Sequence, residues 1–215
     1  VGKPVVLVIS AGSALDLSWA DAHVAAIIDS FYPGARGGKA VAEAIFGDFS
    51  PSGKLPVTFY QGTENLPEFT DYDMSDRTYR YTDKNVLYPF GYGLSYTRFE
   101  YSDLTLSSDS FPGRIDVSVK ISNTGKVAGK EVVQLYLTAP AVLQDKPERE
   151  LKGFAKTRLL APGESQVLTF TLDPRSLCSF RSGISSWVAE AGSYEVKIGA
   201  SSQDIRQRAS FSLGK

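Results

Sequence analysis

YPGARGGKAVAEAIFGDFSPSGKLPVTF occupies residues 32–59, and YPFGYGLSY follows at residues 88–96. Both segments are rich in glycine, proline and aromatic residues, which form tight turns and fill the junctions between packed elements. Neither segment contains a plausible nucleophile together with its base. These two stretches therefore indicate the structural frame of a larger assembly rather than its reactive groups.

Residues 1–59 alternate short apolar runs with helical patterns. The apolar run at residues 3–10 is typical of a parallel strand that is buried on both faces. The predicted elements are, in order, a strand at Val5–Ile9, a short helix at Trp19–Val24 with Asp16 and Ser18 as caps, a strand at Ala25–Phe31, a helix at Lys39–Phe46 that ends at Gly47, and a strand at Lys54–Phe59. This order predicts a parallel α/β layer. Three strands are too few to close such a sheet, so we expect part of the layer to lie upstream of Val1.

The pattern changes to a period of two residues from about Thr97. Apolar and polar residues alternate at 115–121, 133–137, 168–172 and 194–198, and turn residues separate these runs. The alternation predicts an antiparallel β-sandwich whose strands each have one buried and one solvent-facing side. We therefore divide the chain into the C-terminal portion of an α/β domain at 1–62, a connector at 63–96 that wraps the domain junction, and a β-sandwich at 97–215.

Bulk composition argues against several classes of function. The 215 residues are 42% hydrophobic and 22% charged, which is typical of a globular protein. A net charge of −1 without a dense Lys/Arg cluster argues against nucleic acid and acidic membranes as partners. No apolar run approaches the ~20 residues that cross a bilayer. The single Cys178 excludes an internal disulfide and leaves the compartment open, with a secreted or periplasmic location preferred to a cytoplasmic one.

Few residues offer ordinary catalytic or metal chemistry. His23 is the only histidine, and residues 11–15 lack the flanking glycines of a nucleophile elbow. One His and one Cys are too few for an ordinary zinc site. Residues 34–39 (GARGGK) lack the first glycine of a phosphate loop, and Ala40 replaces its final Ser/Thr. The connector has three aspartates without the glycine and the closing glutamate of a calcium loop, namely Asp71, Asp73 and Asp76. We therefore expect no cofactor and no metal.

The two quoted segments, with the second extended to YPFGYGLSYTRFEY at residues 88–101, resemble the C-terminal part of glycoside hydrolase family 3, the β-glucosidase and β-xylosidase family. Motifs further along are similar to the fibronectin type III-like domain of that family: EVVQLYL at 131–137, RELKGF at 149–154, LAPG at 160–163 and WVAEAGSYEVKIG at 187–199. The resemblance covers essentially the whole chain. It implies a function in the hydrolysis of terminal β-D-glucosyl or β-D-xylosyl residues of oligosaccharides.

The resemblance also implies where the reactive groups lie. Retaining hydrolysis uses two carboxylates ~5–5.5 Å apart across the sugar. In this family an aspartate nucleophile lies on an N-terminal TIM-like barrel, and a glutamate acid/base lies shortly upstream of the strand that matches residues 3–10. No catalytic residue is therefore assigned within this chain. The implied partners are that barrel, the upstream α/β segment of the same enzyme and a β-linked oligosaccharide. The resemblance leaves open whether the enzyme forms a homodimer.

The connector offers three candidate substrate-binding side chains. Tyr72 supplies a stacking face, Arg77 a fork of donors and Tyr79 a hydroxyl group, all of which suit a sugar. The structural alternatives are packing of the tyrosines on the sandwich and pairing of Arg77 with a neighbouring aspartate, Asp73 or Asp76. The nearby acidic side chains are interpreted as solvated loop charges: Glu64, Glu68, Asp71 and Asp73.

A non-enzymatic module is the alternative function. In that case the sandwich binds polysaccharide or another protein, as free sandwiches of this type often do. The α/β pattern of residues 1–59 argues against this alternative, because an adhesion module has no need of such a fragment. Retention of residues 97–215 on insoluble glucan or xylan would favour it.

Overall fold

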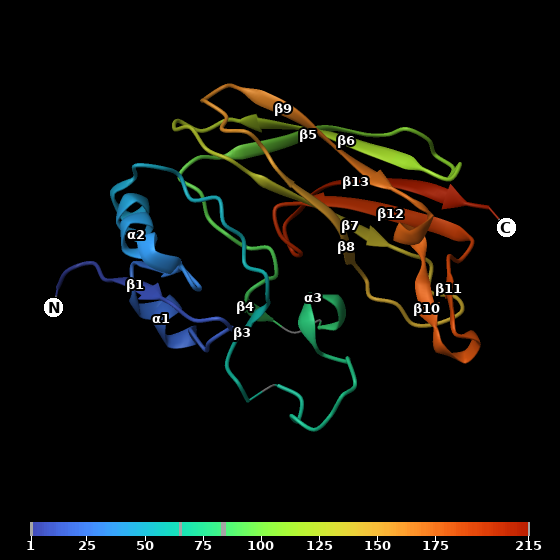
Figure 1. Ribbon diagram of the computed structural model, residues 1–215, viewed down its shortest axis with the longest axis horizontal. Helices are drawn as coiled ribbons and strands as arrows, with labels where there is room; N and C mark the ends of the chain where they lie inside the picture. Colours follow the sequence, from blue (N-terminus) through green and yellow to red (C-terminus); the bar gives the residue numbers. More distant parts are fainter. Residues whose placement is uncertain (1, 65, 83–84, 215) are drawn as a thin grey trace.

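The computed structural model describes residues 2–64, 66–82 and 85–214 (Figure 1). A small α/β portion lies at one end of the molecule and a two-sheet β-sandwich at the other. The connector passes between them and extends away from both. None of the helices within the described ranges is long and apolar enough to cross a membrane.

The α/β portion contains two parallel strands and two helices. Strand β1 (Val6–Ile9) pairs with β2 (Ala26–Asp29) in parallel, with Val6 opposite Ala26. Helix α1 (Ser18–His23) connects the two strands, and α2 (Gly37–Phe46) follows a 3₁₀ turn at Gly34–Arg36. These elements confirm the predicted strand–helix–strand–helix order.

The predicted end of α2 is confirmed, but the predicted caps of α1 are wrong. Leu17 is the N-cap residue of α1 and no side chain caps the helix, whereas Ser18 is its first residue and Asp16 only accepts the Ser18 amide hydrogen bond at 3.0 Å. Gly47 ends α2 in the left-handed conformation, with φ of 81°, and its N–H group bonds the carbonyls of the last turn. Glycine is favoured there because it has no Cβ atom to clash in that conformation.

The predicted third strand at Lys54–Phe59 is wrong. Only Phe59–Tyr60 is extended in a sheet (β3), and it pairs antiparallel with β4 (Val86–Tyr88) rather than with β1 or β2. The preceding backbone is held by the connector instead, because Leu55 donates to the Tyr92 carbonyl and accepts from the Gly91 amide, both at 2.8 Å. Phe59 itself is buried in a small core with Ile9 and Leu17.

The β-sandwich has a four-stranded and a three-stranded sheet, and all neighbouring strands are antiparallel. The first sheet has the order β13 (Ile205–Leu213), β12 (Gly192–Gly199), β7 (Val132–Thr138) and β8 (Glu150–Lys156). The second sheet has the order β5 (Phe99–Leu106), β6 (Ile115–Asn123) and β9 (Ser165–Leu172). Alternate residues of both sheets fill one apolar core, as predicted for β6 and β9.

Strand β7 departs from the predicted alternation, because both of its faces are buried. Gln134 is 3% exposed and Tyr136 is fully buried, although their side chains point away from the sandwich core. The connector covers this outer face: Gln134 Nε2 donates to the Gly91 carbonyl at 3.1 Å and to the Ala200 carbonyl at 2.8 Å. The prediction failed because the residue pattern of a strand does not indicate whether another segment of the chain packs on its outer face.

The remaining elements are short. Helix α3 (Thr78–Tyr81) lies in the connector beside β8. The hairpin of β10 (Ser179–Arg181) and β11 (Ser186–Val188) lies between β9 and β12 in sequence, at the end of the sandwich away from the α/β portion (Figure 1). One 3₁₀ turn precedes the hairpin at Pro174–Leu177, and another connects its two strands at Ser182–Ile184.

Candidate functional site

The connector loop between β3 and α3 contains two of the candidate residues from the sequence, Tyr72 and Arg77, and the third, Tyr79, lies in α3. Figure 1 shows this loop extending away from the α/β portion and from the sandwich. Its backbone is folded by side-chain hydrogen bonds rather than by a sheet: the Asp71 carboxylate accepts from the Asp73 amide at 2.9 Å, and the Asp73 carboxylate accepts from the Ser75 amide at 2.7 Å. These carboxylates shape turns in the loop.

Arg77 closes the loop from its C-terminal end. Its Nε atom donates to the Asp73 carbonyl at 2.9 Å, and its Nη2 atom donates to the carbonyls of Asp71 at 2.6 Å and Glu68 at 3.1 Å. One guanidinium group therefore binds three backbone carbonyls across nine residues. This arrangement uses the planar fork of arginine to fix the loop shape.

Tyr79 is packed into the domain junction. Its ring stacks on Phe90, with centroids 4.4 Å apart, and meets the edge of Tyr136 at 5.8 Å. Its hydroxyl oxygen accepts the Leu151 amide hydrogen bond at 3.0 Å. The next residue, Arg80, forms an ion pair with Glu150 at 3.0 Å. Helix α3 is therefore attached to the outer side of β7 and β8.

Tyr72 has the opposite environment, because 90% of its surface is exposed. Phe69, three residues earlier, is almost fully exposed as well. The loop thus holds two aromatic side chains in solvent, on a backbone that Arg77 keeps in one shape. The structure does not bring Tyr72, Arg77 and Tyr79 together around one space, and substrate binding by the three stays a prediction. Phe69 was not among the candidates, although its place beside Tyr72 in FTDYD was a usable signal.

The α/β portion presents further exposed apolar surface. Val6 and Val8 of the two-stranded sheet are 39% and 41% exposed. Trp19 of α1 and Phe46 of α2 are more exposed still. Parallel sheets are normally covered on both faces, so apolar side chains exposed on such a sheet indicate a contact region.

The other residues considered in the sequence have local partners. The His23 ring stacks on Trp19 with centroids 4.5 Å apart, and its Nδ1 atom lies 2.7 Å from the Trp19 carbonyl. The Cys178 thiol donates to the Pro174 carbonyl at 3.2 Å. Asp21 accepts a 2.5 Å hydrogen bond from the Tyr88 hydroxyl, and burial together with this carboxylate raises the pKa of Tyr88. Within the described ranges, no cluster of three or more His, Cys, Asp or Glu side chains is placed to hold a metal ion.

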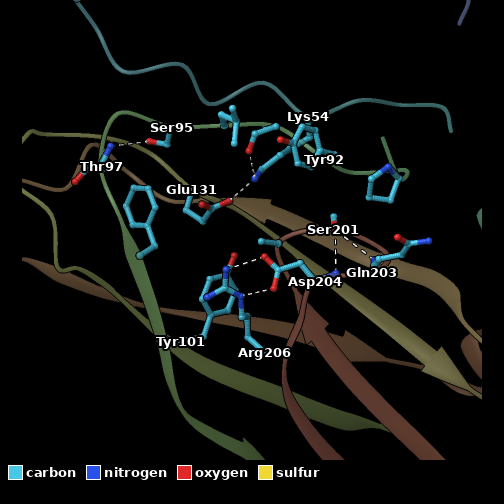
Figure 2. Close-up of a pocket in the computed structure, with 15 residues that line it drawn as sticks. Lys54, Tyr92, Ser95, Thr97, Tyr101, Glu131, Ser201, Gln203, Asp204 and Arg206 are labelled. Carbon is cyan, nitrogen blue, oxygen red and sulfur yellow. Dashed lines mark hydrogen bonds and ion pairs between the residues drawn. The ribbon is translucent and has the colours of Figure 1, made fainter. Parts of the chain in front are cut away.

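A pocket of about 420 Å³ lies where the connector meets the sandwich (Figure 2). Lys54 and Glu131 form an ion pair at 3.0 Å on one side of it, and both side chains are largely buried. Arg206 pairs with Asp204 on another side, through Nη2 and Oδ2 at 2.7 Å. The remaining lining residues come from the connector, from β5 and the residues just before it, and from the β12–β13 turn: Pro89, Tyr92, Gly93, Leu94, Ser95, Thr97, Phe99, Tyr101, Ala200, Ser201 and Gln203.

Tyr101 has a buried hydroxyl group at this pocket. The hydroxyl oxygen has no hydrogen-bond partner among the described residues. Burial raises the pKa of Tyr101 strongly, and the negative charges of Glu131 and Asp204 raise it further, whereas Arg206 lowers it. The phenol therefore stays protonated and remains a donor. Sequence reasoning missed this pocket, because its residues come from four separate segments of the chain.

Comparison with known proteins gives matches to both parts of the chain. The glycosyl hydrolase family 3 C-terminal domain model matches residues 1–96, and the fibronectin type III-like domain model matches residues 131–202. The chain is 40% identical to β-glucosidase BoGH3A from Bacteroides ovatus, covering 98% of this chain and 30% of that protein. It is 39% identical to a xylan 1,4-β-xylosidase from Xylanibacter ruminicola, covering 94% of this chain and 23% of that protein.

Solved structures give the same picture. The structure of β-glucosidase 3B from Thermotoga neapolitana in complex with glucose matches with a TM-score of 0.90 and 42% identity, and the match covers all of this chain and 32% of that one. The chain thus spans about a third or less of the length of these relatives, in each of which it matches the C-terminal part.

Proposed function

Because the chain belongs to glycoside hydrolase family 3, as the C-terminal part of its members, we propose that it is the C-terminal region of a retaining β-glycosidase. The resemblance noted in the sequence is confirmed by both domain models. The proposed reaction is hydrolysis of terminal β-D-glucosyl or β-D-xylosyl residues of oligosaccharides. The names of the relatives, which are β-glucosidases and β-xylosidases, support both sugars.

The proposed division of labour assigns both reactive carboxylates to other parts of the enzyme. The nucleophile comes from an N-terminal TIM-like barrel and the acid/base from an upstream α/β segment, ~5–5.5 Å apart across the sugar. This chain holds that segment in place and supplies loops at the edge of the substrate site. It does not itself hold or transfer the proton in the reaction.

The exposed apolar side chains of the α/β portion are the observation that carries this proposal. An isolated pair of parallel strands with valines exposed on it, such as Val6 and Val8, is unstable in water unless another surface covers it. In a family 3 enzyme that surface is proposed to be the rest of the α/β domain. Phe46 and Trp19 are further exposed apolar side chains, on the helices of the same portion.

The chain alone is expected to show no turnover of p-nitrophenyl β-D-glucoside or β-D-xyloside. Co-expression with the upstream region of a family 3 enzyme that lacks this part should restore turnover. Release of p-nitrophenol measures both results. A purified chain that turns over either substrate by itself would refute the proposed division of labour.

We further propose that Tyr72 contacts the sugar, and that Arg77 and Tyr79 position it through the loop they hold. In an intact enzyme, Tyr72→Ala should raise KM for an aryl glycoside about fivefold to tenfold, because a stacking face is lost. Tyr72→Phe keeps that face and should stay near the wild-type value. Arg77→Met should raise KM and also speed amide exchange across residues 66–77, an effect Tyr72→Ala should lack.

The matched control is Phe154→Ala, which removes an exposed aromatic side chain that belongs to β8 and not to the loop between β3 and α3. It should leave KM unchanged. An unchanged KM for Tyr72→Ala would remove Tyr72 from the substrate site.

A further inference from the structure

The pocket of about 420 Å³ between the connector and the sandwich is called the junction pocket below. The charged side chains around it form two ion pairs. Lys54 is bound to Glu131 at 3.0 Å and also donates to the Gly93 carbonyl at 3.2 Å. Arg206 is bound to Asp204 through two nitrogen atoms. A charged ligand would find no unpaired charge of opposite sign in the pocket. Its own charge would then be unpaired, which is unfavourable in a partly buried site. The charge pattern therefore favours a neutral ligand.

The paired carboxylates retain capacity to accept hydrogen bonds. Glu131 Oε1 receives the Val132 amide at 2.9 Å in addition to Lys54. A carboxylate offers about four acceptor positions, so acceptor sites remain on both Glu131 and Asp204. Groups that donate hydrogen bonds without carrying charge, such as alcohols, match these sites.

Tyr101 supplies the complementary donor. Its buried hydroxyl makes no hydrogen bond within the described residues and feels the charges of Glu131 and Asp204, which line the same pocket (Figure 2). Buried hydroxyl groups in proteins are almost always partnered. A ligand hydroxyl can accept from Tyr101 while it donates to one of the two carboxylates, so one alcohol group satisfies both sides.

The remaining walls provide apolar contact. Tyr92 lines the pocket and is held by stacking on Tyr88, with centroids 5.3 Å apart, while Phe99 and Leu94 contribute further apolar surface. Sugars present C–H groups that pack against such surfaces. The volume of about 420 Å³ lies within the range of small-molecule sites and far exceeds the ~30 Å³ of one water molecule.

From this combination we propose that the junction pocket binds a neutral polyhydroxylated molecule of monosaccharide size. Alcohol groups of the ligand accept from Tyr101 and donate to Glu131 and Asp204. Its C–H groups lie against Tyr92 and Phe99. This site goes beyond the proposed hydrolytic function and does not depend on it.

Hydrogen–deuterium exchange of the intact enzyme, which is this chain together with its proposed upstream region, locates binding at this pocket. With D-glucose as the probe, peptides that cover residues 92–101 and 199–206 should gain protection in a saturable way. Sodium D-glucuronate, which keeps the sugar ring and adds a negative charge, should need at least a tenfold higher concentration to reach the same protection. No protection of these two peptides at 100 mM D-glucose would overturn the proposal.

Two pocket variants and one control sharpen the test. Tyr101→Phe removes one hydroxyl and should shift the D-glucose midpoint about fivefold to tenfold upward. Asp204→Asn should weaken binding similarly, and because it alters an ion pair whose side chains are about half exposed, we expect it to change the free energy of unfolding little. Tyr194→Phe removes a buried hydroxyl that donates to the Glu190 carbonyl at 2.7 Å, outside the pocket, and should leave the midpoint unchanged.

Equal midpoints for wild type and both pocket variants would also overturn the proposal, because protection would then come from another site. The exchange readout is independent of turnover. An intact enzyme that lacks turnover but shows normal protection of these peptides would contradict the glycosidase proposal alone. An active protein without protection would contradict the pocket alone.

Discussion

Glu190→Gln is expected to lower the free energy of unfolding by about 3 kcal/mol. Glu190 and Lys146 form an ion pair at 2.7 Å, and each side chain is only 4% exposed. The other Glu190 oxygen accepts the amides of Val142 and Leu143, both at 2.9 Å. Loss of the negative charge leaves a buried ammonium group without compensation, which is more harmful than loss of the whole pair.

Chemical denaturation measures this effect, and two further variants interpret it. The double variant Lys146→Met with Glu190→Gln should be more stable than the sum of the single effects predicts, because it removes both charges. Glu43→Gln breaks an exposed ion pair with Lys39 at 3.4 Å and should change stability by less than about 0.5 kcal/mol. A Glu190→Gln variant as stable as Glu43→Gln would contradict the buried-pair interpretation.

The effect should also depend on pH. Burial disfavours the charged form of Glu190, but hydrogen bonds from Lys146 and from the Leu143 and Val142 amides outweigh it and lower the pKa of the carboxyl group. A lowered pKa gives stability that is fully present above the ordinary value of 4.5 and is lost as pH falls through the folded-state pKa. The difference between wild type and Glu190→Gln should therefore shrink below pH 4.5.

Gly91→Ala is expected to lower the free energy of unfolding by about 3 kcal/mol or more. Gly91 has φ of 81°, a conformation that costs other residues about 1–2 kcal/mol. A Cβ atom there would also lie 1.9 Å from Gln134 Oε1, so the amide would have to move. Its bonds to the carbonyls of Gly91 and Ala200 would then break, and each buried carbonyl left unpaired costs about 1–3 kcal/mol.

Gly163→Ala is the matched control for this prediction. Gly163 has nearly the same conformation, with φ of 80°, but a Cβ atom would meet nothing within 4 Å. Its substitution should show the backbone effect alone, about 1–2 kcal/mol by thermal or chemical unfolding. Equal effects at the two glycines would mean that the contact with Gln134 contributes nothing to stability.

Local sequence patterns predicted an element correctly where residues within that element determine its structure. Strand β6 follows its alternation of apolar and polar residues, and α2 ends at the glycine expected to end it. Patterns failed where a distant segment supplies the partner. The backbone of Leu55 binds the connector rather than a neighbouring strand, and Tyr136 is buried by a segment more than forty residues earlier.

The candidate site was predictable in part for the same reason. Tyr72 and Arg77 belong to a segment whose composition already distinguishes it, although the sequence did not indicate that Arg77 binds backbone carbonyls. The junction pocket left no comparable signal. Lys54, Tyr101, Glu131 and Asp204 lie far apart in the chain, and only the folded structure brings them to one space.

The attachment of α3 to the outer face of the sandwich has a consequence for protein engineering. Tyr79 and Arg80 contact Leu151 and Glu150 of β8, two and three residues after Arg77, which holds the exposed loop. The fibronectin type III-like domain therefore supports the connector and cannot be removed without changing it. Truncation after residue 96 would retain every residue of the loop. It would remove the β8 residues that α3 contacts, and the loop would lose that support.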